Sequence, residues 1–303
     1  MASRRYPSDL SNTQWGCLKP HVPVAKHRGR PRLHSPREIL NPVFYVLKAG
    51  CQWRMLPRDF PPWKTVYHYF GSWRVDGTWE RINREIRERL RVLAGRSPDP
   101  SAGVVDSQSA KTTGVGREAL GYDGGKKICG RKRHILVDTE GLLLKVKVHS
   151  ARISDQDGLR LLLGSIGAEA PRLSRLWVDA GYRGRGKEWA QRSFGLSVEV
   201  VHRSPKPPPE KVLLAWAMEW HKEGRNIDIE KMFPRRGLEI LPRRWVAGRT
   251  FAWLCHNRRM VRDHERLCST GEAFVYAAMT RLMVKRLARG ECFSDSYSTR
   301  FKE

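Results

Sequence analysis

Five short runs of β-branched and apolar residues in the middle of the chain constrain the fold more than any other feature of the sequence. They span residues 103–106, 134–137, 142–148, 176–179 and 196–201. Their length and composition are typical of buried strands. Helical patterns near residues 156–163 and 186–194 separate the later runs, so the order is β-β-β-α-β-α-β followed by helices. This order predicts an α/β domain over residues 101–290.

The first 96 residues show helical patterns instead. Ser35, Pro36 and Glu38 have the spacing of a helix start, with a capping serine, a proline in the first turn and a capping-box glutamate. Apolar residues then recur at spacings of three and four over residues 79–93, and four arginines are expected on the helix surface between them: Arg81, Arg84, Arg87 and Arg91. We therefore expect a small all-helical domain over residues 1–96.

The last third of the chain contains a break and then further helices. The segment Ser-Pro-Lys-Pro-Pro-Pro at residues 204–209 cannot continue a strand or a helix, and it predicts a loop or insertion over about 204–237. Residues 251–265 and 272–289 have helical patterns, and residues 291–303 are expected to form a tail.

The charge of the chain points to a polyanionic partner. The sequence has 57 Lys and Arg against 31 Asp and Glu, a formal net charge of +26, and the basic residues recur from Arg4 to Lys302. Each phosphate that a Lys or Arg neutralises releases condensed counterions, so this balance favours nucleic acid. A ribosome-associated protein and a merely solubilising basic surface are the alternatives.

The cysteines and the hydropathy pattern indicate a reducing compartment. Six scattered cysteines form no C-x-x-C pair, so a disulfide framework or a structural zinc site is not expected. The N-terminal segment lacks the apolar stretch of a signal peptide, and no run of about 18 apolar residues occurs. We expect a cytoplasmic protein with no membrane contact.

Two aspartates, Asp106 and Asp179, stand at the ends of apolar strand-like runs. A carboxylate there is costly to desolvate unless a cation, a helix end or hydrogen bonds accept it. Hard divalent ions such as Mg²⁺ prefer oxygen ligands and support phosphodiester chemistry. The alternative is that each aspartate only caps a turn before a Gly- or Ser-rich loop.

Four ordered blocks resemble those of the insertion-sequence-five family of DDE transposases. They are V-V-D-S-Q-S around Asp106, G-R-K-R-H-I-L-V-D-T from Gly130, W-V-D-A-G-Y-R-G from Trp177 and R-R-W-V-A-G-R-T-F-A-W-L from Arg243. Residues 29–70 resemble the helical region of that family that binds the element's ends. The resemblance covers nearly the whole chain, and it implies an RNase H-like mixed sheet flanked by helices and preceded by a small all-helical DNA-binding domain.

The resemblance also implies a reaction. Asp106 and Asp179 match the first two metal-binding aspartates of the family's acidic triad, with Mg²⁺ or Mn²⁺ as the metal. The family cuts one strand at the terminal inverted repeats, and the freed 3′-hydroxyl attacks target DNA. Double-stranded DNA is the implied partner and no nucleotide cofactor is required. Because two DNA ends are handled together, we expect a homodimer on DNA. We also expect the protein to be associated with the nucleoid.

The third acidic position departs from the family pattern, because Gly248 stands where the family has Glu. A hydrogen atom cannot ligate Mg²⁺, and losing a ligand should weaken catalysis by more than the roughly 10- to 100-fold seen for changes behind the ligands. Asp263 is too distant to substitute, roughly 22 Å away along a continuous helix. Glu230 and Glu239 remain as candidate substitutes.

Three functions therefore stay open at this point. The chain is a DNA transposase whose cleavage is impaired by Gly248, a catalytically inactive transposase-derived DNA-binding regulator, or a general metal-dependent nuclease.

Basic residues in several segments are expected to contact DNA. They are Arg28, Arg30 and Arg32 in a Gly-Arg-Pro arm, Lys126, Lys127, Arg131 and Lys132 in a Gly-rich stretch, Arg183 and Arg244 in the matched blocks, and Arg249, Arg258, Arg259 and Arg262. On a helix over residues 251–265, Arg258, Arg262 and Arg266 would form a column facing a phosphate backbone. The alternative is a solvated face paired with Asp263 and Glu265.

Two further patterns bear on ligands. The Gly-rich stretch lacks P-loop spacing, so nucleotide binding is not expected. We interpret His134 and His149 as structural or DNA-facing, not as metal ligands.

Overall fold

The computed structural model describes residues 6–24, 31–114, 118–166, 170–201, 208–224 and 244–290. Its N-terminal part is helical, as the sequence predicts. The elements are α1 (Asn12–Leu18), η1 (Lys19–His21), α2 (Pro36–Ala49), η2 (Trp53–Met55), α3 (Trp63–Val75) and α4 (Thr78–Leu93). The predicted start of α2 is confirmed, because the Ser35 hydroxyl accepts from the Glu38 amide while the Glu38 carboxylate accepts from the Ser35 amide at 2.7 Å.

The middle of the chain forms one mixed sheet. Its strands are β1 (Ala102–Lys111), β2 (Gly121–Asp123), β3 (Ile128–Asp138), β4 (Leu143–Ser150), β5 (Arg175–Val178) and β6 (Ser197–Val200). The strand order is β2-β3-β1-β5-β6, and β4 also pairs with β3. β1 is antiparallel to β3 and parallel to β5, and β5 is parallel to β6. All five predicted runs are strands, and the short β2 is an addition.

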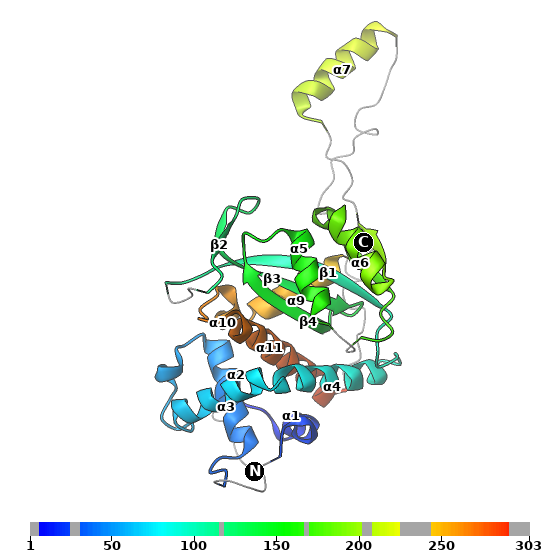
Figure 1. Cartoon of the computed structure of the whole chain (residues 1–303). Helices are drawn as coiled ribbons and strands as arrows, with labels where there is room; N and C mark the ends of the chain where they lie inside the picture. The colour runs from blue at the N-terminus through cyan, green and yellow to red at the C-terminus, as the bar shows by residue number, and fades with distance from the viewer. Residues whose placement is uncertain are drawn as a thin grey trace.

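Helices cover both faces of the sheet (Figure 1). The predicted helices between the later strands are confirmed as α5 (Asp155–Gly164) and α6 (Arg185–Phe194), with the turn η4 (Ala180–Tyr182) after β5. Successive strand residues point to opposite faces. Val105 therefore packs in one apolar cluster with residues of α5 and α6, while Val104 packs in a second cluster on the face covered by α4, α9 (Trp245–Cys255) and α11 (Cys268–Arg289).

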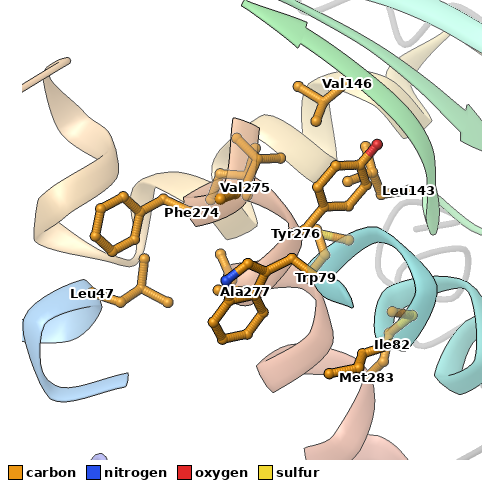
Figure 2. Close-up of a cluster of buried hydrophobic side chains, with 14 of the residues drawn as sticks. Leu47, Trp79, Ile82, Leu143, Val146, Phe274, Val275, Tyr276, Ala277 and Met283 are labelled. Atoms are coloured by element: carbon orange, nitrogen blue, oxygen red, sulfur yellow. The ribbon is translucent and has the colours of Figure 1, made fainter. Parts of the chain in front are cut away.

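The N-terminal helices and the sheet share that second cluster. Figure 2 shows α11 contributing Phe274, Val275 and Tyr276 between Trp79 of α4 and the strand residues Leu143 and Val146. Phe274 also lies 4.6 Å from Phe70 of α3, measured between ring centroids. A helix from the end of the chain thus completes the core of the helices at its beginning. The boundary expected at residue 96 lies just after α4, and the division of the chain into these domains stays a prediction.

The predicted helix over residues 251–265 is wrong. α9 ends at Cys255, and the following helix α10 (Arg258–Val261) has four residues. Asn257 interrupts the helix, because its side-chain amide donates to the carbonyl of Leu254 at 3.1 Å. The chain then runs extended beside β1, where the Asp263 amide donates to the Lys111 carbonyl at 2.9 Å. The expected column of arginines on one helix face is therefore absent from this described segment.

The expectation for the α4 arginines is wrong for two of the four. Arg87 and Arg91 are buried, because α4 packs against both α11 and β4. Arg87 donates to the Leu143 carbonyl at 3.1 Å. The helix is therefore enclosed on two sides.

The predicted insertion over about 204–237 includes one described helix, α7 (Glu210–Lys222), which lies apart from the sheet (Figure 1). Residues 204–207, 225–237 and the expected tail lie outside the described residues. Across the part of the chain that the structure describes, no helix is both long and apolar enough to cross a membrane.

Candidate active site

The register of β1 and β5 brings Asp106 and Asp179 together. The two strands are parallel, with Val104 paired to Trp177. Asp106 and Asp179 each stand two positions further along, so continuing the register places them side by side on one face. This is also the face that α9 covers. The two carboxylates that the sequence singles out are therefore neighbours. Only Asp179 follows the end of its strand, because β1 continues past Asp106 to Lys111.

The surroundings of Asp106 affect its charge in opposite directions. Burial raises the pKa of Asp106 above its usual value, and the nearby Asp179 carboxylate raises it further. The Ser107 amide, which donates to Asp106 at 2.8 Å, and the charges of Arg244 and Lys126 oppose this rise. Because the pKa is raised overall, additional positive charge beside Asp106 would stabilise its ionised form.

Asp179 has two different partners. Its Oδ1 accepts from the Gly181 amide at 2.8 Å and caps η4, which is the turn-capping role considered as an alternative. Its Oδ2 accepts from Nη2 of Arg244 at 2.9 Å. Capping therefore uses one oxygen, and the other faces a cation.

Gly248 lies in the first turn of α9, four residues after Arg244. Positions four apart share one helix face, so Gly248 faces the side from which Arg244 reaches Asp179. The residue is exposed, and a Cβ built on it would meet no atom within 4 Å. A glutamate is therefore sterically acceptable at this position.

Asp155 is a third carboxylate close to Asp179, and no pattern in the sequence singles it out. Its Oδ1 accepts from the Ser107 hydroxyl at 3.0 Å and from Lys132 Nζ at 3.1 Å. A Cβ on Gly181 would lie 2.9 Å from Asp155 Oδ2 and 3.0 Å from Asp179 Oδ1, so the two carboxylates flank this glycine. In the sequence, Ser154 and Asp155 show only an ordinary helix start.

The charge of Asp155 is strongly stabilised. Burial raises the pKa of Asp155, but the nearby His134 ring, whose Nε2 lies 3.5 Å from Oδ1, and the charge of Lys132 outweigh burial and hold the pKa well below its usual value. His134 lies in β3, and its Nδ1 is 2.7 Å from Nε2 of His149 in β4. Both histidines are buried, so their structural interpretation agrees with this placement.

Three basic residues expected to face DNA are buried instead, and that expectation is corrected. Arg131 is 0% exposed and bonds to the carbonyls of Glu118, Glu265 and Arg266. Lys132 bonds to Asp155, and Arg259 pairs with Glu265 at 2.7 Å. Arg131 and Arg259 tie the extended segment after α10 to the rest of the fold, so neither is presented to a partner.

Apart from Arg244, which pairs with Asp179, the other predicted DNA contacts fall into three groups. Lys126, Lys127, Arg183, Arg258 and Arg262 are exposed, and Lys126 Nζ donates to the Ser107 carbonyl at 3.1 Å. Arg32 donates to the Pro23 carbonyl, while Arg249 lies against the rings of Trp245 and Trp253. Arg28 and Arg30 lie outside the described residues, as do Glu230 and Glu239.

The carboxylate oxygens of Asp106 and Asp179 are suitable ligands for a hard cation. Among the described residues, no group of three His, Cys, Asp or Glu side chains is placed to hold a metal ion. However, Mg²⁺ commonly binds through one or two carboxylates plus waters and substrate phosphates. The oxygens of Asp106 and Asp179 therefore fit such an ion, with Arg244 as a competing cation.

Comparison with known proteins identifies the family. Residues 97–284 match the family model described as a transposase DDE domain, and residues 10–83 match a putative transposase of the IS4/5 family. The first match covers more than half of the chain, which therefore belongs to the DDE transposases of the IS4/5 type. A relative from Burkholderia cepacia, the insertion element IS402 uncharacterized 16.2 kDa protein, is 31% identical over 116 residues. That match covers 36% of this chain and 77% of the relative.

The family assignment confirms the expected fold. The DDE domain is RNase H-like, and this chain has the mixed sheet with helices on both faces that the sequence predicts. The assignment also supports polynucleotidyl transferase chemistry for the domain.

Proposed function

We propose that this chain binds the terminal inverted repeats of a bacterial insertion sequence and carries a strand-cleavage and strand-transfer site at Asp106 and Asp179. Its cleavage is impaired because Gly248 supplies no third carboxylate. The observation that supports the proposal most is the parallel pairing of β1 with β5, whose last pair, Val104 and Trp177, lies two residues before each aspartate. Such a protein works as a homodimer on double-stranded DNA, in the cytoplasm at the nucleoid.

Asp106 and Asp179 are the residues that would hold Mg²⁺ or Mn²⁺. DDE transposase domains generally use divalent metal ions, which, when bound, activate an attacking hydroxyl and stabilise the leaving oxygen of a phosphodiester. The protein brings the two carboxylates together through β1 and β5 and holds Asp179 in place through its turn-capping bond to Gly181.

Positive side chains beside this pair suit the DNA backbone. Lys126 and Lys127 are exposed in the turn between β2 and β3, and the charge of Lys126 acts on Asp106. Arg183 is exposed just after η4. Phosphates that approach the carboxylates therefore meet the positive charge of Lys126, which lowers the repulsion between DNA and the acidic pair.

A second candidate function is a transposase-derived DNA-binding regulator that occupies element ends without cutting them. Two observations favour it over a fully active enzyme. Gly248 has no carboxylate, and Arg244 already engages Asp179 at 2.9 Å. This candidate keeps the same DNA partner and differs only in the chemistry.

One experiment separates the candidates. Duplexes carrying the inverted repeats that flank the gene are tested for binding and for Mg²⁺-dependent cleavage with the natural protein, Gly248→Glu, Gly248→Ala and Asp106→Asn. We expect end-specific binding by all four proteins. Cleavage should be feeble in the natural protein and more than about 10- to 100-fold faster in Gly248→Glu, judged from the usual loss on weakening a metal site.

The controls define each outcome. Gly248→Ala adds helix propensity without a ligand and should not accelerate cleavage, and Asp106→Asn should abolish it. Binding without any cleavage, restored by Gly248→Glu, favours the regulator. Cleavage without preference for the inverted repeats favours a general nuclease, and loss of DNA affinity in Asp106→Asn contradicts the metal assignment.

A further inference from the structure

Arg244 provides a positive charge directly at the acidic pair. Its Nη2 donates to Asp179 Oδ2 at 2.9 Å, and the two side chains are only 18% and 24% exposed. The charge of the same guanidinium opposes the rise in the pKa of Asp106 that burial causes. One arginine therefore acts on both carboxylates, which otherwise repel each other.

The position of Arg244 explains why Gly248 matters beyond the loss of a ligand. A glutamate at position 248 would stand four residues after Arg244 on the same helix face, at the spacing of a helical ion pair. It would offer Arg244 an alternative partner, because nothing lies within 4 Å of a Cβ at position 248. With glycine there, α9 offers no carboxylate at this position, and Arg244 pairs with Asp179.

We propose that Arg244 serves as a tethered counter-ion of the Asp106–Asp179 pair, and that it competes with divalent cations for Asp179. A divalent ion at Asp179 must displace the guanidinium or bind beside a like charge, and both lower its affinity. The pair is thereby held together without a metal. This inference rests on the proposed function, but it concerns cation binding and needs no DNA cleavage to test it.

The test is a titration of the DNA-free full-length protein with Mn²⁺, followed by electron paramagnetic resonance of the free ion. Arg244→Gln removes the competing charge, and we expect Mn²⁺ affinity to rise by about 10-fold or more, as for a substantial change next to a metal site. Gly248→Glu should raise the affinity as well, because it adds a carboxylate and draws Arg244 away. Asp179→Asn should lower it.

Two variants make the test specific. Arg244→Lys keeps the charge and should leave the affinity near that of the natural protein. Arg192→Gln removes an arginine that pairs with Glu188 on α6, away from the acidic pair, and it should also leave the affinity unchanged.

Thermal unfolding tests the same inference without a measurement of Mn²⁺ affinity. The metal-free Arg244→Gln protein should unfold at a lower temperature than the natural protein, because its two carboxylates repel without a counter-ion. Saturating Mn²⁺ should raise its Tm by more than it raises that of the natural protein.

The failures are distinguishable. If the natural protein binds Mn²⁺ and Arg244→Gln binds it no more tightly, Arg244 does not compete and the inference is overturned while the metal site stands. If no variant binds Mn²⁺ at all, the metal site of the proposed function is wrong, and the inference is overturned with it.

Discussion

Arg91 in α4 forms a buried ion pair with Asp138, the last residue of β3. The two side chains are 6% and 0% exposed. Asp138 also accepts hydrogen bonds from the amides of Glu140 at 2.9 Å and Leu142 at 2.8 Å. The carboxylate therefore closes the turn between β3 and β4 and, at the same time, bonds the N-terminal helices to the sheet.

Asp138→Asn should destabilise the protein strongly. The substitution leaves the Arg91 guanidinium buried without an opposite charge, and breaking such a pair typically costs about 3–5 kcal/mol. Urea unfolding measures the loss. Glu188→Gln, which breaks an exposed pair on α6, should cost no more than about 0.5 kcal/mol. A loss below about 1 kcal/mol in Asp138→Asn would show that the pair contributes little.

Gly158→Ala should damage the packing of α5 on the sheet. A Cβ at this position would lie 2.2 Å from Cε1 of the buried His134 ring. Overpacking of this kind costs roughly 1–3 kcal/mol. Gly164→Ala in the same helix meets nothing within 4 Å and should be neutral or stabilising, by up to about 1 kcal/mol. Equal stability of the two variants in chemical denaturation would rule out the contact with His134.

The stability of the protein should fall on mild acidification. Burial lowers the pKa of His134 and lowers that of His149 to about 4, whereas an unfolded histidine titrates near 6.5. Between these values the unfolded chain binds more protons than the folded one. The stabilisation is therefore complete above a pH of about 6.5 and declines towards pH 4, with a slope of up to about 1.4 kcal/mol per pH unit for each imidazole.

Denaturant unfolding at a series of pH values measures this slope. His149→Gln should reduce it, because one of the imidazoles with a lowered pKa is removed. The exposed His256 is the matched control, and His256→Gln should leave the slope unchanged. An unchanged slope in His149→Gln would assign the acid sensitivity to other groups.

The exposed and buried basic residues should respond differently to substitution. Lys126→Ala and Lys127→Ala should each weaken DNA binding and reduce the slope of log affinity against log salt by about one unit. Arg131→Ala should instead lower the free energy of unfolding, because it leaves Asp263 buried without its partner at 3.4 Å. If Lys126→Ala changes the stability but not the salt slope, the turn between β2 and β3 does not contact phosphates.

The sequence predicts the elements well wherever a local pattern determines them. The apolar runs locate five strands, and the capping residues locate the start of α2. The sequence pattern fails where contacts between residues distant in the chain determine which side chains are buried. The basic run around Arg131 and Lys132 has the composition of an exposed segment, but β3 is an inner strand of the sheet, and distant carbonyls and carboxylates accept these charges.

The residues of the candidate site are likewise only partly predictable from the sequence. Asp106 and Asp179 are recognisable because each ends an apolar run, and the parallel register then makes them neighbours. Asp155 gives no such signal, because its role depends on how α5 packs beside Ser107 and Gly181. The helix break at Asn257 is likewise invisible to apolar periodicity, which continues through it.

The position of α11 has a consequence for how the protein is made. During synthesis the apolar faces of α2, α3 and α4 leave the ribosome long before Phe274 and its neighbours, which cover them in the finished molecule. A polypeptide that stops before residue 268 leaves those faces exposed, in a state prone to aggregation and proteolysis. The core of the N-terminal helices is therefore complete only when synthesis has passed through α11, to Arg289.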